Sequence, residues 1–168
     1  SLKSVTIPAG VTEMKGGVFL GCPMIMHITV DKNNQIYDSR NGCNAVIETA
    51  TGTIVVACNA TVIPNNVTKI GESAFASLAF KEIILPHGMT EIGRWAFWGC
   101  ASLTNITIPD TVKSIGASAL KKCTSLASIT FKGTMKQWGE INKQVDWNLE
   151  VNKNAVIHCT NGDIKIES

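Results

Sequence analysis

The sequence predicts an α/β solenoid, a coiled chain of short parallel strands with an inserted β-hairpin and a C-terminal cap. Three observations predict it. One apolar phrase recurs every 22 or 23 residues along most of the chain. Residues 31–60 interrupt this period with a polar loop and two apolar runs around Thr51 and Gly52, and after Phe131 the period stops. Self-similarity at a fixed period of roughly 20 to 50 residues indicates a repeat architecture.

The repeat is clearest between Leu103 and Cys123. This copy holds Leu103, Ile106, Ile108, Pro109, Val112, Ile115, Gly116, Ala119, Leu120 and Cys123 in order. The copy before it fills the same positions with Phe80, Ile83, Leu85, Pro86, Met89, Ile92, Gly93, Ala96, Phe97 and Cys100. Less complete copies begin at Ile63 and Leu2, and in the copy from Ile63 the cysteine position is assigned to Ser77.

Each part of the phrase has a structural meaning. An I-x-I step predicts a short strand with alternate residues inward, and the proline after it ends the strand because it cannot donate a ladder hydrogen bond. V-x-x-I-G predicts a second extended piece closed by a glycine turn. A-F/L-x-x-C is compatible with one turn of α- or 3₁₀-helix. Each copy therefore forms one coil with an inward apolar ring, which neighbouring coils stacked at about 4.8 Å bury.

The interruption is expected to form a β-hairpin over about 44–58 that turns near Thr51 and Gly52. Pairing Glu48 with Thr53 would place on one face the side chains of Cys43, Ala45, Ile47, Ile54, Val56 and Cys58. Cys43 and Cys58 would then lie opposite each other, either as a cross-strand disulfide or as two buried thiols. Such an insertion either covers the adjacent coils or lies on a binding face.

The C-terminal segment differs from the repeats. Thr134 followed three residues later by Gln137 is a capping-box pattern that predicts the start of a helix. Because the end of a solenoid exposes its apolar core, we expect Trp138 and Trp147 to cover the last coil rather than stack on a ligand. The predicted organisation is a repeat region over 1–131, including the inserted segment 31–60, and a capping segment over 132–168.

The copies resemble the leucine-rich repeats of the BspA-like surface proteins, whose phrase is close to L-x-x-I-x-I-P-x-x-V-x-x-I-G-x-x-A-F-x-x-C. The resemblance covers about 1–30 and 61–131, and the interruption and the tail are similar to segments common in that family. It implies a right-handed leucine-rich-repeat superhelix that is extracellular, either secreted or displayed on the cell surface. It also implies a non-enzymatic role in adhesion or protein binding, with a protein or host-matrix partner.

Composition argues against other partners. The net charge is +2 and no basic run is longer than Lys121–Lys122, which disfavours nucleic acid as the main partner. No apolar run approaches the ~18 residues of a membrane-spanning helix. No signal-peptide pattern opens the chain, and its first residues already lie inside a repeat, at Leu2. We therefore expect the chain to be part of a longer precursor.

The sequence predicts no catalytic residues, no cofactor and no metal site. His27, His87 and His158 are scattered, without the H-x-x-x-H or C-x-x-C partners of a zinc site. Calcium-loop, P-loop and G-x-S-x-G spacings are absent from the sequence. Cys100 and Cys123 occupy a repeat position that faces the coil interior, which argues against a nucleophile. An enzyme is therefore not expected.

The outward face of the strands is the remaining candidate for a binding site. Threonine and serine dominate it, as the preference of β-branched residues for strands explains. The departures from this background, with one neighbouring amide, define the predicted binding residues His27, Val62, Glu82, Ile84 and Asn105. A structural spacer or assembly module without a specific ligand is the alternative.

Two tryptophans mark a second surface. Trp95 and Trp98 flank the Ala-Phe pair of one copy, where other copies carry Ser73, Ala76, Ser118 and Lys121. We expect both rings to be partly exposed on the convex side.

Overall fold

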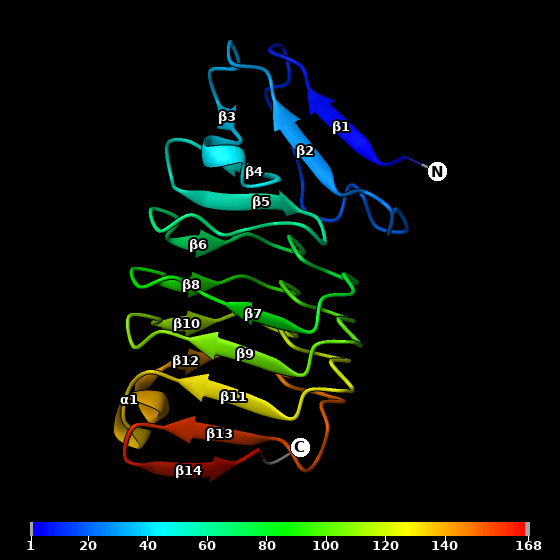
Figure 1. The fold of residues 1–168 in the computed structure, drawn as a ribbon. Helices are drawn as coiled ribbons and strands as arrows, with labels where there is room; N and C mark the ends of the chain where they lie inside the picture. The colour runs from blue at the N-terminus through cyan, green and yellow to red at the C-terminus, as the bar shows by residue number, and fades with distance from the viewer. Residues whose placement is uncertain (1, 167–168) are drawn as a thin grey trace.

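The computed structural model describes residues 2–166 as a stack of coils with the two termini at opposite ends (Figure 1). A two-stranded parallel sheet joins β1 (Ser4–Ile7) and β2 (His27–Val30). A five-stranded sheet has the order β14 (Gly162–Lys165), β13 (Val156–Cys159), β11 (Ser128–Phe131), β9 (Asn105–Ile108), β7 (Glu82–Ile84). A seven-stranded sheet has the order β12 (Asn142–Lys143), β10 (Ser114–Ile115), β8 (Glu91–Ile92), β6 (Lys69–Ile70), β5 (Thr53–Ala57), β4 (Ala45–Glu48), β3 (Tyr37–Asp38).

The five-stranded sheet forms because the I-x-I steps stack in register. Ile83, Ile106, Ile129 and Ile157 are Cα partners in successive parallel strands. Ile106 and Ile129 have no exposed surface. Only β14 runs antiparallel to its neighbour, β13. The prediction of short parallel strands with alternate residues inward is therefore confirmed.

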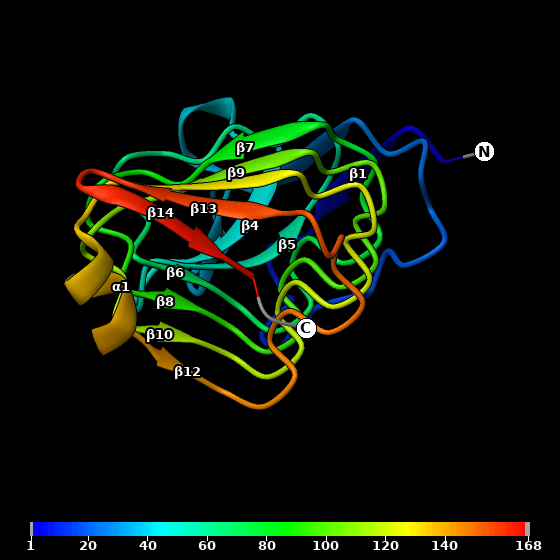
Figure 2. The same ribbon diagram turned by 90° about the horizontal axis from the view of Figure 1, so that it is seen from below.

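The V-x-x-I-G steps form the opposite layer (Figure 2). β6, β8 and β10 each contribute one buried isoleucine, and a glycine follows each of them. A Cβ atom built on Gly93 would lie 2.6 Å from the carbonyl oxygen of Ile70, and one on Gly116 would lie 2.5 Å from the backbone nitrogen of Arg94. Glycine is needed here because the backbone of the preceding coil leaves no room for a side chain.

Turns, not a helix, form the third side of each coil. Ser73, Trp95, Ser118 and Asp146 share a left-handed backbone with φ between 53° and 55°. The N–H groups of the first three link the coils: that of Ser73, for example, donates to the carbonyl oxygen of Arg94 at 3.0 Å. In the described part of the chain the six-residue α1 (Met135–Glu140) is the only α-helix. The fold is therefore mostly β rather than α/β.

These turns also correct the alignment of one copy. The N–H of Leu78 donates to the carbonyl oxygen of Phe75, as that of Cys100 donates to that of Phe97. Leu78, not Ser77, therefore occupies the cysteine position. The residue missing from this copy falls after Leu78, in the loop before β7.

The inserted segment extends the seven-stranded sheet. After the 3₁₀ turn η1 (Arg40–Gly42), β4 and β5 form the predicted hairpin, and β5 pairs in parallel with β6. Both faces of the hairpin are buried. Ile47 and Ile54 pack in the larger apolar cluster, whereas Val46 and Val56 pack with the first two coils in a smaller one. The hairpin thus separates two cores instead of covering one.

The predicted hairpin register is correct near the turn and wrong beyond it. Ile47 pairs with Ile54 as expected, but Ala45 pairs with Ala57 instead of Val56. A β-bulge between these pairs shifts the register, and a shift of one residue turns every later side chain to the other face.

The bulge also separates the two cysteines. Cys43 packs in the larger cluster and Cys58 in the smaller one, and both are free thiols. The expectation that they share a face is wrong, and no cross-strand disulfide joins them.

The helix α1 begins as the sequence predicts. The hydroxyl of Thr134 accepts from the N–H of Gln137, and the side chain of Gln137 accepts from the N–H of Thr134. The capping box is therefore confirmed. Trp138 is buried, with ring centroids 5.2 Å from Phe131 and 5.8 Å from Trp147.

Beyond α1 the backbone completes one more coil without the repeat phrase. β12 pairs in parallel with β10, and β13 pairs in parallel with β11. Between them the N–H of Leu120 donates to the carbonyl oxygen of Trp147, which continues the ladder of turns. The assignment of 132–168 as a segment that caps the solenoid stays a prediction. The elements in it that leave the repeat geometry are α1 and β14.

Candidate functional site

The outward side chains of the five-stranded sheet form two rows across its strands. One row is Glu82, Asn105, Ser128, Val156 and Lys165, and the other is Ile84, Thr107, Thr130, His158 and Asp163. The middle of this face is polar and internally hydrogen-bonded. The hydroxyl of Ser128 lies 3.0 Å from Oδ1 of Asn105, and that of Thr130 lies 3.4 Å from the same atom.

The structure brings three of the five predicted binding residues together at the β7 edge of this sheet. Glu82 and Asn105 are Cα partners, and Ile84 lies two residues further along β7. Ile84 is 72% exposed and Glu82 is also exposed. An exposed aliphatic side chain therefore stands beside a carboxylate and an amide.

The other two predicted residues lie apart from this edge. Val62 is 71% exposed but belongs to no strand, and its N–H donates to the carbonyl oxygen of Cys43 at 3.0 Å rather than to β7. His27 is exposed on β2, in the separate two-stranded sheet. The insertion therefore interrupts the continuous face that the period predicted.

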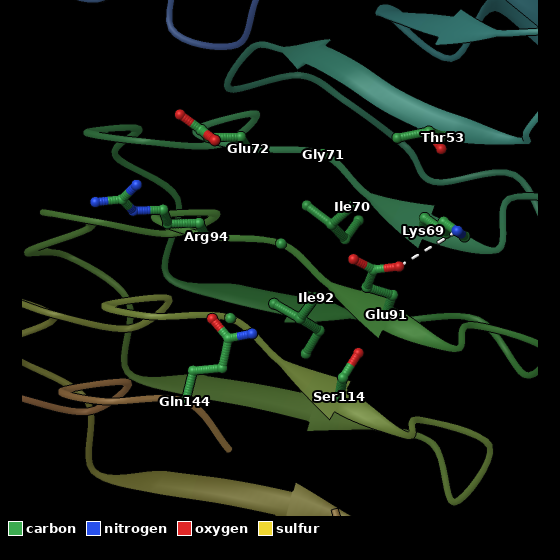
Figure 3. A pocket seen from close by; sticks show the side chains of 12 residues that line it. Thr53, Lys69, Ile70, Gly71, Glu72, Glu91, Ile92, Arg94, Ser114 and Gln144 are labelled. Carbon is green, nitrogen blue, oxygen red and sulfur yellow. Dashed lines mark ion pairs between the residues drawn. The ribbon is translucent and has the colours of Figure 1, made fainter. Parts of the chain in front are cut away.

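A polar depression of about 380 Å³ lies on the outer face of the seven-stranded sheet (Figure 3). Its floor includes the glycines that follow β6, β8 and β10, so no side chains fill it. Lys69 and Glu91 form an ion pair of 3.3 Å at one rim, while Glu72, Arg94 and Gln144 project at the other. The side chains of the ion pair are almost half exposed, which limits its stabilising effect to about 1 kcal/mol or less.

Sequence reasoning missed this depression, although the sequence holds its signal. The signal is the stacked glycines of V-x-x-I-G, with charged residues at the variable positions beside them. Within residues 2–166, no group of three or more His, Cys, Asp and Glu side chains is placed to hold a metal ion. The depression can therefore offer a partner hydrogen-bonding groups and the two charged side chains of its ion pair, but its residues do not assemble a metal centre.

Residues 1–45 and 56–144 match the family model of the BspA type leucine rich repeat region, in six copies. The chain belongs to the BspA-type leucine-rich-repeat family. No curated protein matches the chain in sequence.

Solved structures share the fold of this BspA-type chain. A leucine-rich repeat protein from Eubacterium ventriosum is 28% identical with a TM-score of 0.62, and the alignment covers 77% of this chain and 36% of that one. The pneumococcal vaccine antigen PcpA is 16% identical with a TM-score of 0.57, covering 96% of this chain and 45% of that one. The BspA-type chain thus spans less than half of either protein.

The cysteines of the BspA-type phrase are structural. The thiol of Cys100 lies 3.1 Å from the carbonyl oxygen of Phe75, and that of Cys123 lies 3.2 Å from that of Phe97. Each thiol therefore bonds to the turn of the preceding coil. Burial raises the pKa of Cys100 to about 12 and also raises the pKa of Cys123, so neither is a ready nucleophile at neutral pH.

None of the helices in the described residues of this BspA-type chain has the length and apolar character to cross a bilayer.

Proposed function

We propose that this BspA-type chain is a non-enzymatic, protein-binding adhesion domain of a secreted or cell-surface protein. Its contact surface is the β7 edge together with Val62 and His27, and its partner is a protein or a host-matrix component. The observation that carries the proposal is the exposure of Ile84 and Val62, at 72% and 71%. Exposed apolar side chains that gather on one surface mark contact sites, where a few central residues carry most of the binding energy.

A structural spacer without a specific ligand is the second candidate, and a particular observation favours it. Outward polar side chains bond to each other across the coils, as between the hydroxyls of Thr6 and Thr29 at 3.0 Å and between Ser128 and Asn105 at 3.0 Å. These groups are satisfied within the solenoid, so they contribute to cohesion between coils without any partner.

Binding of the chain to a panel of purified extracellular-matrix proteins tests the proposal. The face variant replaces His27, Val62, Glu82 and Ile84 with Ser, Thr, Ser and Thr, the background residues of this face. A matched control is Val145→Thr, because Val145 is as exposed as Val62, at 73%, but lies in a turn near the C-terminal end. Each exposed substitution should change the free energy of unfolding by no more than about 0.5 kcal/mol.

We expect the wild type and Val145→Thr to bind one of these proteins equally, and the face variant to bind it at least about tenfold more weakly. Equal binding by the face variant would exclude this surface. Failure of the wild type to bind any protein in the panel would favour the spacer.

A further inference from the structure

A cleft of about 390 Å³ lies on the turn side of the solenoid, apart from the outer faces of the sheets. Leu20, Ser73, Ala76, Trp95 and Trp98 line it. Leu20 is 51% exposed and both indole rings are half-buried, which confirms the expected partial exposure of the two tryptophans. The volume lies within the range of about 300–1,000 Å³ that is usual for ligand sites.

One wall of this cleft is Leu20, which belongs to the turn of the first coil. Counted from the N-terminus, the first coil contains β1, the second β2 and the insertion, the third β6, and the fourth β7 and β8. The hairpin takes the place of the turn in the second coil, so the turn of the first coil packs directly on that of the third. The contact is close: a Cβ atom built on Gly16 would lie 1.5 Å from the carbonyl oxygen of Glu72, and one on Gly17 would lie 3.6 Å from Cβ of Ser73. Leu20, in the same turn as these glycines, thereby reaches the tryptophans of the fourth coil.

The fold itself does not require the two tryptophans. The equivalent residues of the third coil are Ser73 and Ala76, and these small side chains serve the same backbone. Trp95 also has φ of +54°, a left-handed conformation that is unusual for a bulky side chain. The same backbone recurs at Ser73 and Ser118, so the turn imposes it and the fold gains nothing from placing a bulky aromatic side chain there.

One positively charged side chain lies over each ring. Cζ of Arg94 lies 3.8 Å from the ring centroid of Trp95, and Nζ of Lys122 lies 5.4 Å from that of Trp98. Within residues 2–166 neither cation forms an ion pair, although Glu72 projects from the coil next to Arg94 (Figure 3). The charges beside the cleft therefore complement an anionic ligand.

We propose that this cleft binds a short acidic peptide segment. One large apolar side chain of the peptide enters between Leu20 and the indoles, and flanking Asp or Glu carboxylates pair with Arg94 and Lys122. A peptide fits better than an acidic saccharide because the lining is apolar apart from the hydroxyl of Ser73 and the indole N–H groups, which leaves few acceptors and donors for a sugar ring. Each sugar hydroxyl that found no partner there would cost about 1–3 kcal/mol, whereas an apolar side chain of a peptide leaves no polar group unsatisfied.

Selection from a phage-displayed library of random dodecapeptides tests this proposal. The wild type is compared with Trp95→Ser/Trp98→Ala, which installs the residues of the third coil and should keep the melting transition. The enriched peptides should combine net negative charge with a large apolar residue, and synthetic copies should bind the variant at least about tenfold more weakly. Arg94→Gln/Lys122→Gln should also weaken binding, and added salt should weaken it in the wild type.

The cleft does not depend on the sheet face, so the four-residue face variant described above should bind the selected peptides as the wild type does. The proposal is overturned if no selected peptide distinguishes the wild type from the tryptophan variant, or if the selected peptides are neutral or basic. It is also overturned if a heparin tetrasaccharide binds through the two tryptophans and no peptide does, because the ligand class would then be a saccharide.

Discussion

Replacing Gly116 by alanine should lower the free energy of unfolding, although a Gly→Ala change at an unstrained position usually raises it. The added Cβ would lie 2.5 Å from the backbone nitrogen of Arg94, 2.6 Å from the carbonyl carbon of Gly93 and 2.9 Å from Cα of Arg94. All three are backbone atoms, so no flexible side chain can move aside. The N–H of Gly116 also donates to the carbonyl oxygen of Ile92 at 2.7 Å, which holds the two coils at this separation.

Two effects of opposite sign determine the size of the loss. Forcing extra volume into a packed site costs about 1–3 kcal/mol, and stretching the inter-coil hydrogen bond costs about 1 kcal/mol more. Alanine restricts the unfolded chain and returns about 0.4–1 kcal/mol. The net loss is therefore about 1–3.5 kcal/mol, a fall in Tm of about 2–14 °C for a chain of this length.

Urea and thermal unfolding followed by circular dichroism measure this loss, with Gly10→Ala as the matched control. A Cβ atom on Gly10 meets nothing within 4 Å, so that variant should be unchanged or slightly more stable. If Gly116→Ala melts at or above the wild-type Tm with an unchanged urea m-value, the close approach of the coils is not what requires glycine.

Other perturbations give different outcomes. Ile106 has no exposed surface, so Ile106→Asp should cost several kcal/mol and abolish native melting; a wild-type transition would contradict the inward ring. The buried side chain of Asn34 donates to two carbonyls of the first coil at 2.9 and 3.0 Å. Asn34→Ala should therefore cost about 1–3 kcal/mol in urea unfolding, whereas Asn33→Ala should not, and equal stabilities would argue against this anchor. Because burial raises the pKa of Cys100 to about 12, iodoacetamide at pH 8 should label it only after unfolding; mass spectrometry showing native labelling as fast as at the partly exposed Cys22 would refute its burial.

Much of the fold can be predicted from the sequence, because apolar residues must recur at the repeat spacing if every coil is to bury them in the core. The residues predicted to face inward in the copy around Ile106 are buried in the structure. The capping box at Thr134 specifies the start of a helix through local hydrogen bonds. The last coil could not be predicted, because Asn142–Lys143 and the turn after it pair with the preceding coil through backbone hydrogen bonds. Such bonds require no particular side chains, so the sequence there does not show the repeat pattern. The bulge in the hairpin could not be predicted either, because a continuous apolar run on a strand buried on both faces fits either register.

The candidate site was predictable only where the period is unbroken. Glu82 and Asn105 are 23 residues apart and become Cα partners, as the repeat implies. His27 and Val62 stand on either side of the inserted segment, so counting residues could not show that the ladder breaks between them. The tryptophan cleft was visible in sequence only as two aromatic residues at positions where other copies carry small or charged ones.

A single insertion thus has two opposite consequences for binding. By adding β4 and β5 to the seven-stranded sheet, it breaks the face formed by the I-x-I strands and separates His27 from Glu82. By taking the place of a turn in the second coil, it brings Leu20 against the turn of the third coil and next to Trp95 and Trp98. A regular solenoid would present one continuous sheet face and a uniform stack of turns. In this chain the irregularity lies between the second and third coils, and the exposed apolar side chains of both surfaces lie close to it, so the inserted segment is the element that makes these surfaces differ from the repeat background.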